Sequence, residues 1–224
     1  METKYRMFYN VHKGIRNALY STAILAGETD FNNSEEFEKL EKVWGNSLSF
    51  LRFHGHHEDR HCNKPLEAIA PGSAKHCMDD HKHIENKLHS LQSTMDKIKV
   101  TKDEDTRAEL GYKFYHNFNL FISEYLHHMW DEEFNLSKVF MQNFSMEDLL
   151  QMEADIVASL TPEEKGIGLR NMLPAMTKSE IAEFLGTLRR TAPAPAFNAM
   201  AEAASRILPP EKWQAVNEKM LQEA

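Results

Sequence analysis

Hydrophobic residues recur at intervals of three and four along most of this 224-residue chain. That spacing places apolar side chains on one face of an α-helix. No segment shows the sustained alternation of apolar and polar residues that is typical of a β-strand. The pattern therefore predicts an all-α protein.

The apolar pattern predicts four long helices in residues 1–143. They are expected to cover about residues 5–26, 33–62, 77–95 and 103–140. The first begins near Tyr5, Asn33 caps the second, and Pro65 is expected to end the second helix. Because long helices joined by short connections pack in alternating directions, we expect an up-down-up-down four-helix bundle.

Residues 144–224 are expected to form an appendage of short helices beside the bundle. Four start signals recur in this part, at Ser145, Thr161, Thr177 and Pro210. The stretch from Thr191 to Pro195 is expected to be an extended connector. Three roles are open for this extension: a cover for the bundle, a homodimer contact, or a surface for a protein partner.

Charge and cysteine content narrow the class of protein. A formal net charge of -8, without any block of lysine or arginine, argues against binding of nucleic acid or an anionic membrane. The apolar stretches are too short to span a bilayer, and the first ten residues lack the apolar core of a signal peptide. We therefore expect a cytoplasmic protein in which Cys62 and Cys77 are free thiols.

All twelve histidines lie in residues 1–128, and several of them alternate with carboxylates at helical spacing. At about 100° per residue, one face of the second helix carries four side chains able to bind a metal. These are His54, His57, Glu58 and His61, whereas His56 points elsewhere.

The other helices each carry at least one inward histidine. His128 precedes Glu132 by one turn on the inner line of the fourth helix, His81 precedes Glu85 on the third, and His12 lies on the apolar face of the first. Burial of so many polar groups without a partner is unfavourable, so the pattern predicts a metal site. Mixed imidazole and carboxylate ligands suit iron, and manganese or zinc also fit. Since Glu58 and Glu132 could each bridge two cations, we expect a dinuclear centre.

This series of motifs resembles that of hemerythrin-like (HHE cation-binding) domains over residues 1 to about 140. The matching motifs are His12-Lys-Gly-Ile-Arg, His54-x-x-x-Glu58, His81 in Asp-His-Lys-His-Ile-Glu, and His128-Met-x-x-Glu132-Glu133. The resemblance implies a four-helix bundle with two iron ions, held in the usual form by five histidines and two bridging carboxylates. By this resemblance, the residues that match the family's metal ligands are His12, His54, Glu58, His81, His128 and Glu132.

The chain departs from that family pattern on the third helix. In place of the remaining histidine it has Cys77 before His81 and Glu85 after it. His57 and His61 are the natural substitutes, because His57-Glu58-x-x-His61 resembles a helix of iron-sensing F-box hemerythrin domains.

The resemblance implies binding of dioxygen or nitric oxide for storage, sensing or detoxification. A di-iron oxidase or peroxidase and an iron-handling protein are the alternatives, so the sequence leaves open whether the chain is an enzyme. A ferritin-like di-iron site would use Glu58-x-x-His61 and Glu124-x-x-His127. It is disfavoured because the first helix offers no inward glutamate.

Overall fold

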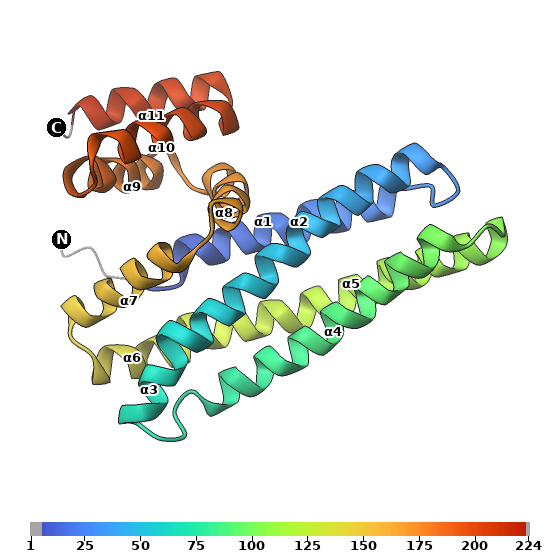
Figure 1. Cartoon of the computed structure of the whole chain (residues 1–224), viewed down its shortest axis with the longest axis horizontal. Coiled ribbons are helices and arrows are strands. Elements are labelled where there is room, and N and C mark those ends of the chain that lie inside the picture. The colour runs from blue at the N-terminus through green and yellow to red at the C-terminus, as the bar shows by residue number, and fades with distance from the viewer. Residues whose placement is uncertain (1–5, 223–224) are drawn as a thin grey trace.

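The computed structural model describes residues 6–222, and this part of the chain consists of helices without a β-strand (Figure 1). The prediction of an all-α protein is confirmed. The expected start of the first helix at Tyr5 lies outside the described residues.

Four long helices lie side by side and share one hydrophobic core (Figure 1). They are α1 (Tyr9–Glu28), α2 (Ser34–Glu58), α4 (Lys75–Val100) and α5 (Glu104–Asp131). Apolar residues three and four positions apart on each helix meet in this core, which includes Leu19, Trp44, Leu51, Leu88, Phe114 and Phe118. The polar cluster described below lies at one end of it.

Side-chain caps fix where α2 and α5 begin. The Asn33 side chain accepts hydrogen bonds from the backbone N–H groups of Glu35 and Glu36, as its position in the sequence predicted. Asp103 caps α5 by accepting from the backbone N–H of Thr106. Both helices therefore start in a defined register, which sets the faces on which their later histidines lie.

Both α2 and α5 pass into a π-helical turn, where the chain makes wider hydrogen-bonded loops. After α2 come η1 (Asp59–Asn63) and α3 (Lys64–Ile69); after α5 come η2 (Glu132–Leu136) and α6 (Ser137–Asn143). The prediction that Pro65 ends the second helix is wrong, because the chain stays helical to Ile69. Pro65 is tolerated since it lies in the first turn of α3, just after the π turn has interrupted the α-helical hydrogen bonds.

Five short helices complete the chain (Figure 1). They are α7 (Met146–Ser159), α8 (Pro162–Ala175), α9 (Lys178–Thr191), α10 (Ala194–Ile207) and α11 (Pro210–Gln222). Capping boxes begin α7, α8 and α9 at the predicted residues Ser145, Thr161 and Thr177. The extended connector is shorter than predicted, because only Ala192 and Pro193 are extended and α10 already begins at Ala194. Pro195 occupies its first turn, where no backbone N–H is needed.

Helix α8 packs directly against α1. A Cβ atom at Gly14 would lie 2.7 Å from Met172 Cγ, so the absence of a side chain permits this close approach. Lys13 Nζ also lies 2.7 Å from Glu180 Oε1 at the start of α9. Helices α9–α11 and the end of α8 share a separate apolar core that includes Leu173, Ile181, Leu185 and Val216. The division into two domains near residue 143 stays a prediction.

No helix among residues 6–222 is both long and apolar enough to cross a membrane.

Candidate metal centre

Six buried polar side chains form a cluster at one end of the four long helices. His12 and His81 lie near the starts of α1 and α4, whereas the others lie near the ends of α2 and α5. The six residues are His12, His54, Glu58, His81, His128 and Glu132. Because neighbouring helices run in opposite directions (Figure 1), these positions, far apart in sequence, meet in space.

Glu132 is the centre of this cluster. Its Oε2 atom lies 3.3 Å from His12 Nε2. On the other side, its Oε1 atom lies 3.3 Å from His128 Nε2 and 3.5 Å from His81 Nε2. The two oxygens of one carboxylate therefore face imidazoles from different helices.

Glu58 lies beside Glu132. Its Oε2 atom is 3.2 Å from His54 Nε2 and 3.6 Å from His81 Nε2, and its Oε1 atom is 3.9 Å from His12 Nε2. Within the described residues, side-chain atoms that could bind a metal lie within 4.8 Å of one another in two groups. The first group is His12, His54, Glu58 and Glu132, and the second group is Cys77, His81, His128 and Glu132. Glu132 belongs to both.

Several of these atoms are buried without a hydrogen-bond partner. They are His12 Nε2, His54 Nε2, His128 Nε2, Glu58 Oε2 and Glu132 Oε2. Each such group costs about 1–3 kcal/mol if nothing binds it. Two donors that each lie about 2.1 Å from one cation, at angles of about 90–110°, are roughly 3.0–3.4 Å apart. The nitrogen–oxygen separations of 3.2–3.5 Å fit that arrangement, so the donor set suits metal ions.

A second layer of carboxylates contacts the outer nitrogens of three histidines. Glu133 Oε1 lies 2.9 Å from His12 Nδ1, and Asp59 Oδ1 lies 2.7 Å from His81 Nδ1. Asp80 Oδ2 lies 3.5 Å from His128 Nδ1. In a neutral ring, an Nδ1–H that donates to a carboxylate leaves Nε2 free to bind a metal, and the contact also orients the ring.

Two of these outer carboxylates directly follow the inner glutamates in sequence. Asp59 follows Glu58 and Glu133 follows Glu132, and each pair stands where an α-helix changes into a π turn. Neighbouring side chains thus reach different targets: the first enters the cluster and the second contacts a histidine on another helix. Sequence reasoning missed both outer carboxylates, although an acidic residue after each inward glutamate was a signal for them.

The pKa shifts show how strongly these groups interact. Burial lowers the pKa of His12, but the nearby carboxylates of Glu132 and Glu133 outweigh it and raise this pKa to about 9. Burial alone dominates at His54, whose pKa lies well below its usual range. Burial and the charge of Glu132 raise the pKa of Glu58. At Glu132 itself, burial is outweighed by the charge of His128 and by the close approach of His12 and His81, so its pKa is low. A metal ion must therefore displace protons to bind.

The structure does not bring three predicted ligands into either group. His57 Nδ1 instead lies 3.0 Å from Ser159 Oγ at the end of α7, and the His61 ring stacks on His57. The π turn changes the rotation per residue, so His61 is no longer on the face that 100° steps predict. Glu85 lies on the surface, where the Nη2 atom of Arg52 approaches its Oε1 atom to 2.9 Å.

The pair needed for a ferritin-like site also lies outside the cluster. Glu124 Oε2 lies 3.3 Å from His83 Nε2, and its Oε1 atom lies 3.3 Å from Lys87 Nζ. His127 is exposed. The Glu124–His127 pair therefore contributes no donor to the buried cluster.

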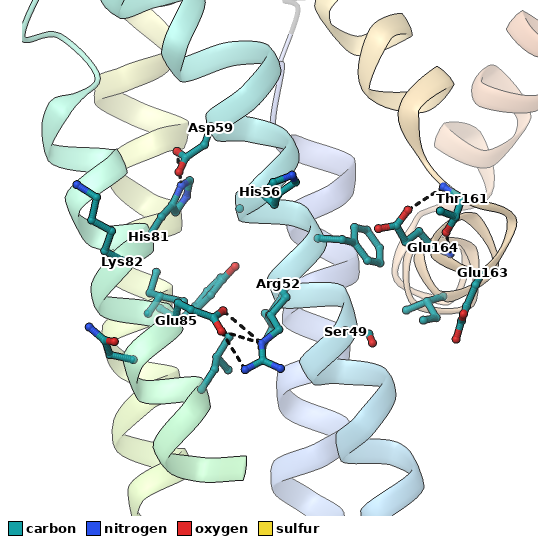
Figure 2. Close-up of a pocket in the computed structure, with 18 residues that line it drawn as sticks. Ser49, Arg52, His56, Asp59, His81, Lys82, Glu85, Thr161, Glu163 and Glu164 are labelled. Atoms are coloured by element: carbon teal, nitrogen blue, oxygen red, sulfur yellow. Dashed lines mark hydrogen bonds and ion pairs between the residues drawn. The ribbon is translucent and has the colours of Figure 1, made fainter. Parts of the chain in front are cut away.

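A pocket of about 870 Å³ opens between α2, α4 and the start of α8 (Figure 2). Gly55, Asp59, His81 and Tyr125 line it, so it reaches the second group of donors. The ion pair of Arg52 with Glu85 crosses from α2 to α4, as Figure 2 shows. The pocket gives small molecules a route toward His81.

Comparison with known protein families and with curated proteins gives no match for this chain.

Proposed function

We propose that this chain is a hemerythrin-like protein: an up-down-up-down four-helix bundle that holds two iron ions and binds dioxygen or nitric oxide. The observation that carries the proposal is the position of Glu132, whose two oxygens face two different groups of buried donors. A carboxylate so placed can join two cations. The order of the donors along α1, α2, α4 and α5 supports the family resemblance.

Reduced iron, when bound by these residues, would supply electrons to a diatomic molecule. The protein residues would hold the iron ions and keep water away from them. Glu58 and Glu132 offset the charge of the cations, while Asp59 and Glu133 orient His81 and His12. Buried aromatic residues such as Phe121 and Tyr125 exclude water from the core side, and the pocket at His81 admits the ligand.

The proposal is tested by anaerobic reconstitution with ferrous iron, followed by optical spectra as nitric oxide or air is admitted. We expect about two iron ions per chain and a spectral change that saturates at one ligand molecule per iron pair. Replacing both His128 and Glu132 by alanine should abolish the change, whereas alanine at the exposed His56 or His83 should leave it intact. An iron-loaded protein whose spectrum does not respond to either gas would contradict the proposal.

The size of the pocket favours a second candidate function. A space of about 870 Å³ is far larger than a diatomic molecule needs, so a small organic reductant can approach His81. The same centre would then act as an oxidase or peroxidase. Steady consumption of dioxygen or peroxide with a small reductant, beyond one equivalent per iron pair, would distinguish turnover from reversible binding.

A further inference from the structure

The second group contains a thiol that the proposed function has not used. Cys77 lies one helical turn before His81 on α4, so both side chains occupy the same face. Its buried sulfur lies 3.1 Å from Glu132 Oε1 and 3.8 Å from His81 Nε2. The sulfur therefore faces the same atoms as the imidazoles of this group.

The neighbouring donors point to an ion at this position. His128 Nε2 is buried and has no hydrogen-bond partner, although it lies 3.3 Å from Glu132 Oε1. That oxygen also accepts a hydrogen bond from the Cys77 thiol. A cation placed among these atoms would contact one sulfur, two nitrogens and one oxygen.

Asn63 supports the sulfur from the other side. The Asn63 side chain is buried in η1, and its amide donates a 3.4 Å hydrogen bond to Cys77 Sγ. The same amide donates a 3.0 Å bond to Asp59 Oδ1, the atom that contacts His81 Nδ1. An N–H donor aimed at sulfur favours the thiolate and tunes its bond to a metal.

We propose that Cys77 binds the second metal ion as a thiolate, which makes the two ions of the centre chemically unequal. This inference rests on the proposed function, since it needs the dinuclear site. The thiol proton is released to solvent as the sulfur–metal bond forms. The first ion has only nitrogen and oxygen donors, whereas the second also has a soft donor, which favours ferrous iron, cobalt or zinc over manganese.

Cobalt(II) is the probe for this inference, because a cobalt–thiolate bond adds a charge-transfer band in the near ultraviolet. We expect the metal-stripped full-length protein to bind about two cobalt ions and to show this band. The Cys77→Ser variant should lose the band, and its affinity for the second cobalt ion should fall by more than about tenfold. Binding of the first ion should persist.

Cys62→Ser is the matched control. Cys62 is as buried as Cys77 and shares its apolar cluster, but it belongs to neither donor group. This variant should keep both the band and the second ion. Circular dichroism of the metal-free variants verifies folding. If Cys77→Ser misfolds, Asn63→Ala gives an independent measurement: the band should stay but move to longer wavelength, because the sulfur loses its hydrogen bond.

Four results would overturn the inference. Two cobalt ions bound without the band would refute sulfur ligation and leave the dinuclear centre standing. Loss of the band in Cys62→Ser as well would mean that the band does not report a bond from Cys77 alone. A band at an unchanged wavelength in Asn63→Ala would mean that the sulfur bound to cobalt is not that of Cys77. Absence of cobalt binding in every protein would refute the proposed metal centre together with this inference.

Discussion

The two sides of the buried cluster differ in how the surrounding helices cover them. On the first side His12 is fully buried, α8 packs behind α1, and Arg16 forms an ion pair with Glu133. On the second side His81 lines a pocket between α2 and α4. Similar donors are thus closed off in one group and approachable in the other. Under the proposed function, the first group would anchor one ion and the second would receive the small molecule.

The largest expected effect is a difference in iron content between variants of Glu132 and variants of Glu58. Glu132 belongs to both groups and Glu58 only to the first. We expect Glu132→Ala to reduce the iron content from about two ions per chain to nearly none, and Glu58→Ala to leave about one. Elemental analysis of reconstituted protein measures this, with exposed Glu163→Ala as the control. Equal losses in the two variants would mean that the groups do not bind separate ions.

The outer carboxylates allow a matched test of the two sides. Glu133→Gln acts on the closed side through His12, and Asp59→Asn acts on the open side through His81. Each should weaken the binding of one ion by about 10–100-fold, because the ring loses the contact that orients it. Competition with a coloured chelator gives both affinities. Unchanged affinities in both variants would show that these contacts do not support the ligands.

Acidification should weaken metal binding even in the neutral range. In the metal-free protein His12 has a pKa of about 9, since the nearby carboxylates of Glu132 and Glu133 outweigh burial. A protonated imidazole cannot bind a metal, so the affinity should rise by about tenfold per pH unit for each displaced proton from pH ~7 to ~9. Glu133→Gln should flatten this dependence. A wild-type affinity that does not change above pH ~7 would contradict the expectation.

Access through the open side predicts a smaller, kinetic effect. A Cβ atom at Gly55 would lie 3.5 Å from the His81 ring, so a larger side chain there would project beside the pocket. Gly55→Leu should slow nitric oxide association several-fold, while the iron content stays unchanged. Gly45 is exposed on the same helix with nothing near its Cβ position, so Gly45→Leu is the control. Stopped-flow association rates that agree in the two variants would place the entry route elsewhere.

Helical periodicity predicted the fold class and the inward positions of the six buried donors. Those predictions rest on 100° steps, which hold along α1, α4 and the regular parts of α2 and α5. They fail after Glu58, where the π turn redirects His61, and they do not decide the role of His57, which is buried but contacts Ser159 of α7. No short-range pattern signals such a turn, because it depends on packing against other helices.

Two further features could be found only in three dimensions. Glu85 shares the expected face with His81, yet α2 and α4 leave a pocket there, and Arg52 approaches Glu85 across it. Cys77, unlike Glu85, does lie among the buried donors. Its position one turn before His81 predicts that it points inward, but only the packing of the helices brings Glu132 to its sulfur. Helix faces are thus readable from sequence, whereas the partner of each side chain depends on how helices meet.

The central claim is that the buried nitrogen and oxygen atoms without hydrogen-bond partners bind metal ions. Thermal unfolding of metal-stripped and iron-loaded protein tests it most directly. A ligand present at about a thousand times its dissociation constant stabilises the folded state by about 4 kcal/mol. For a chain of this size, that corresponds to a rise in melting temperature on the order of 10 °C. We predict this rise in samples verified to carry about two iron ions. Superimposable melting curves at full loading would contradict the account.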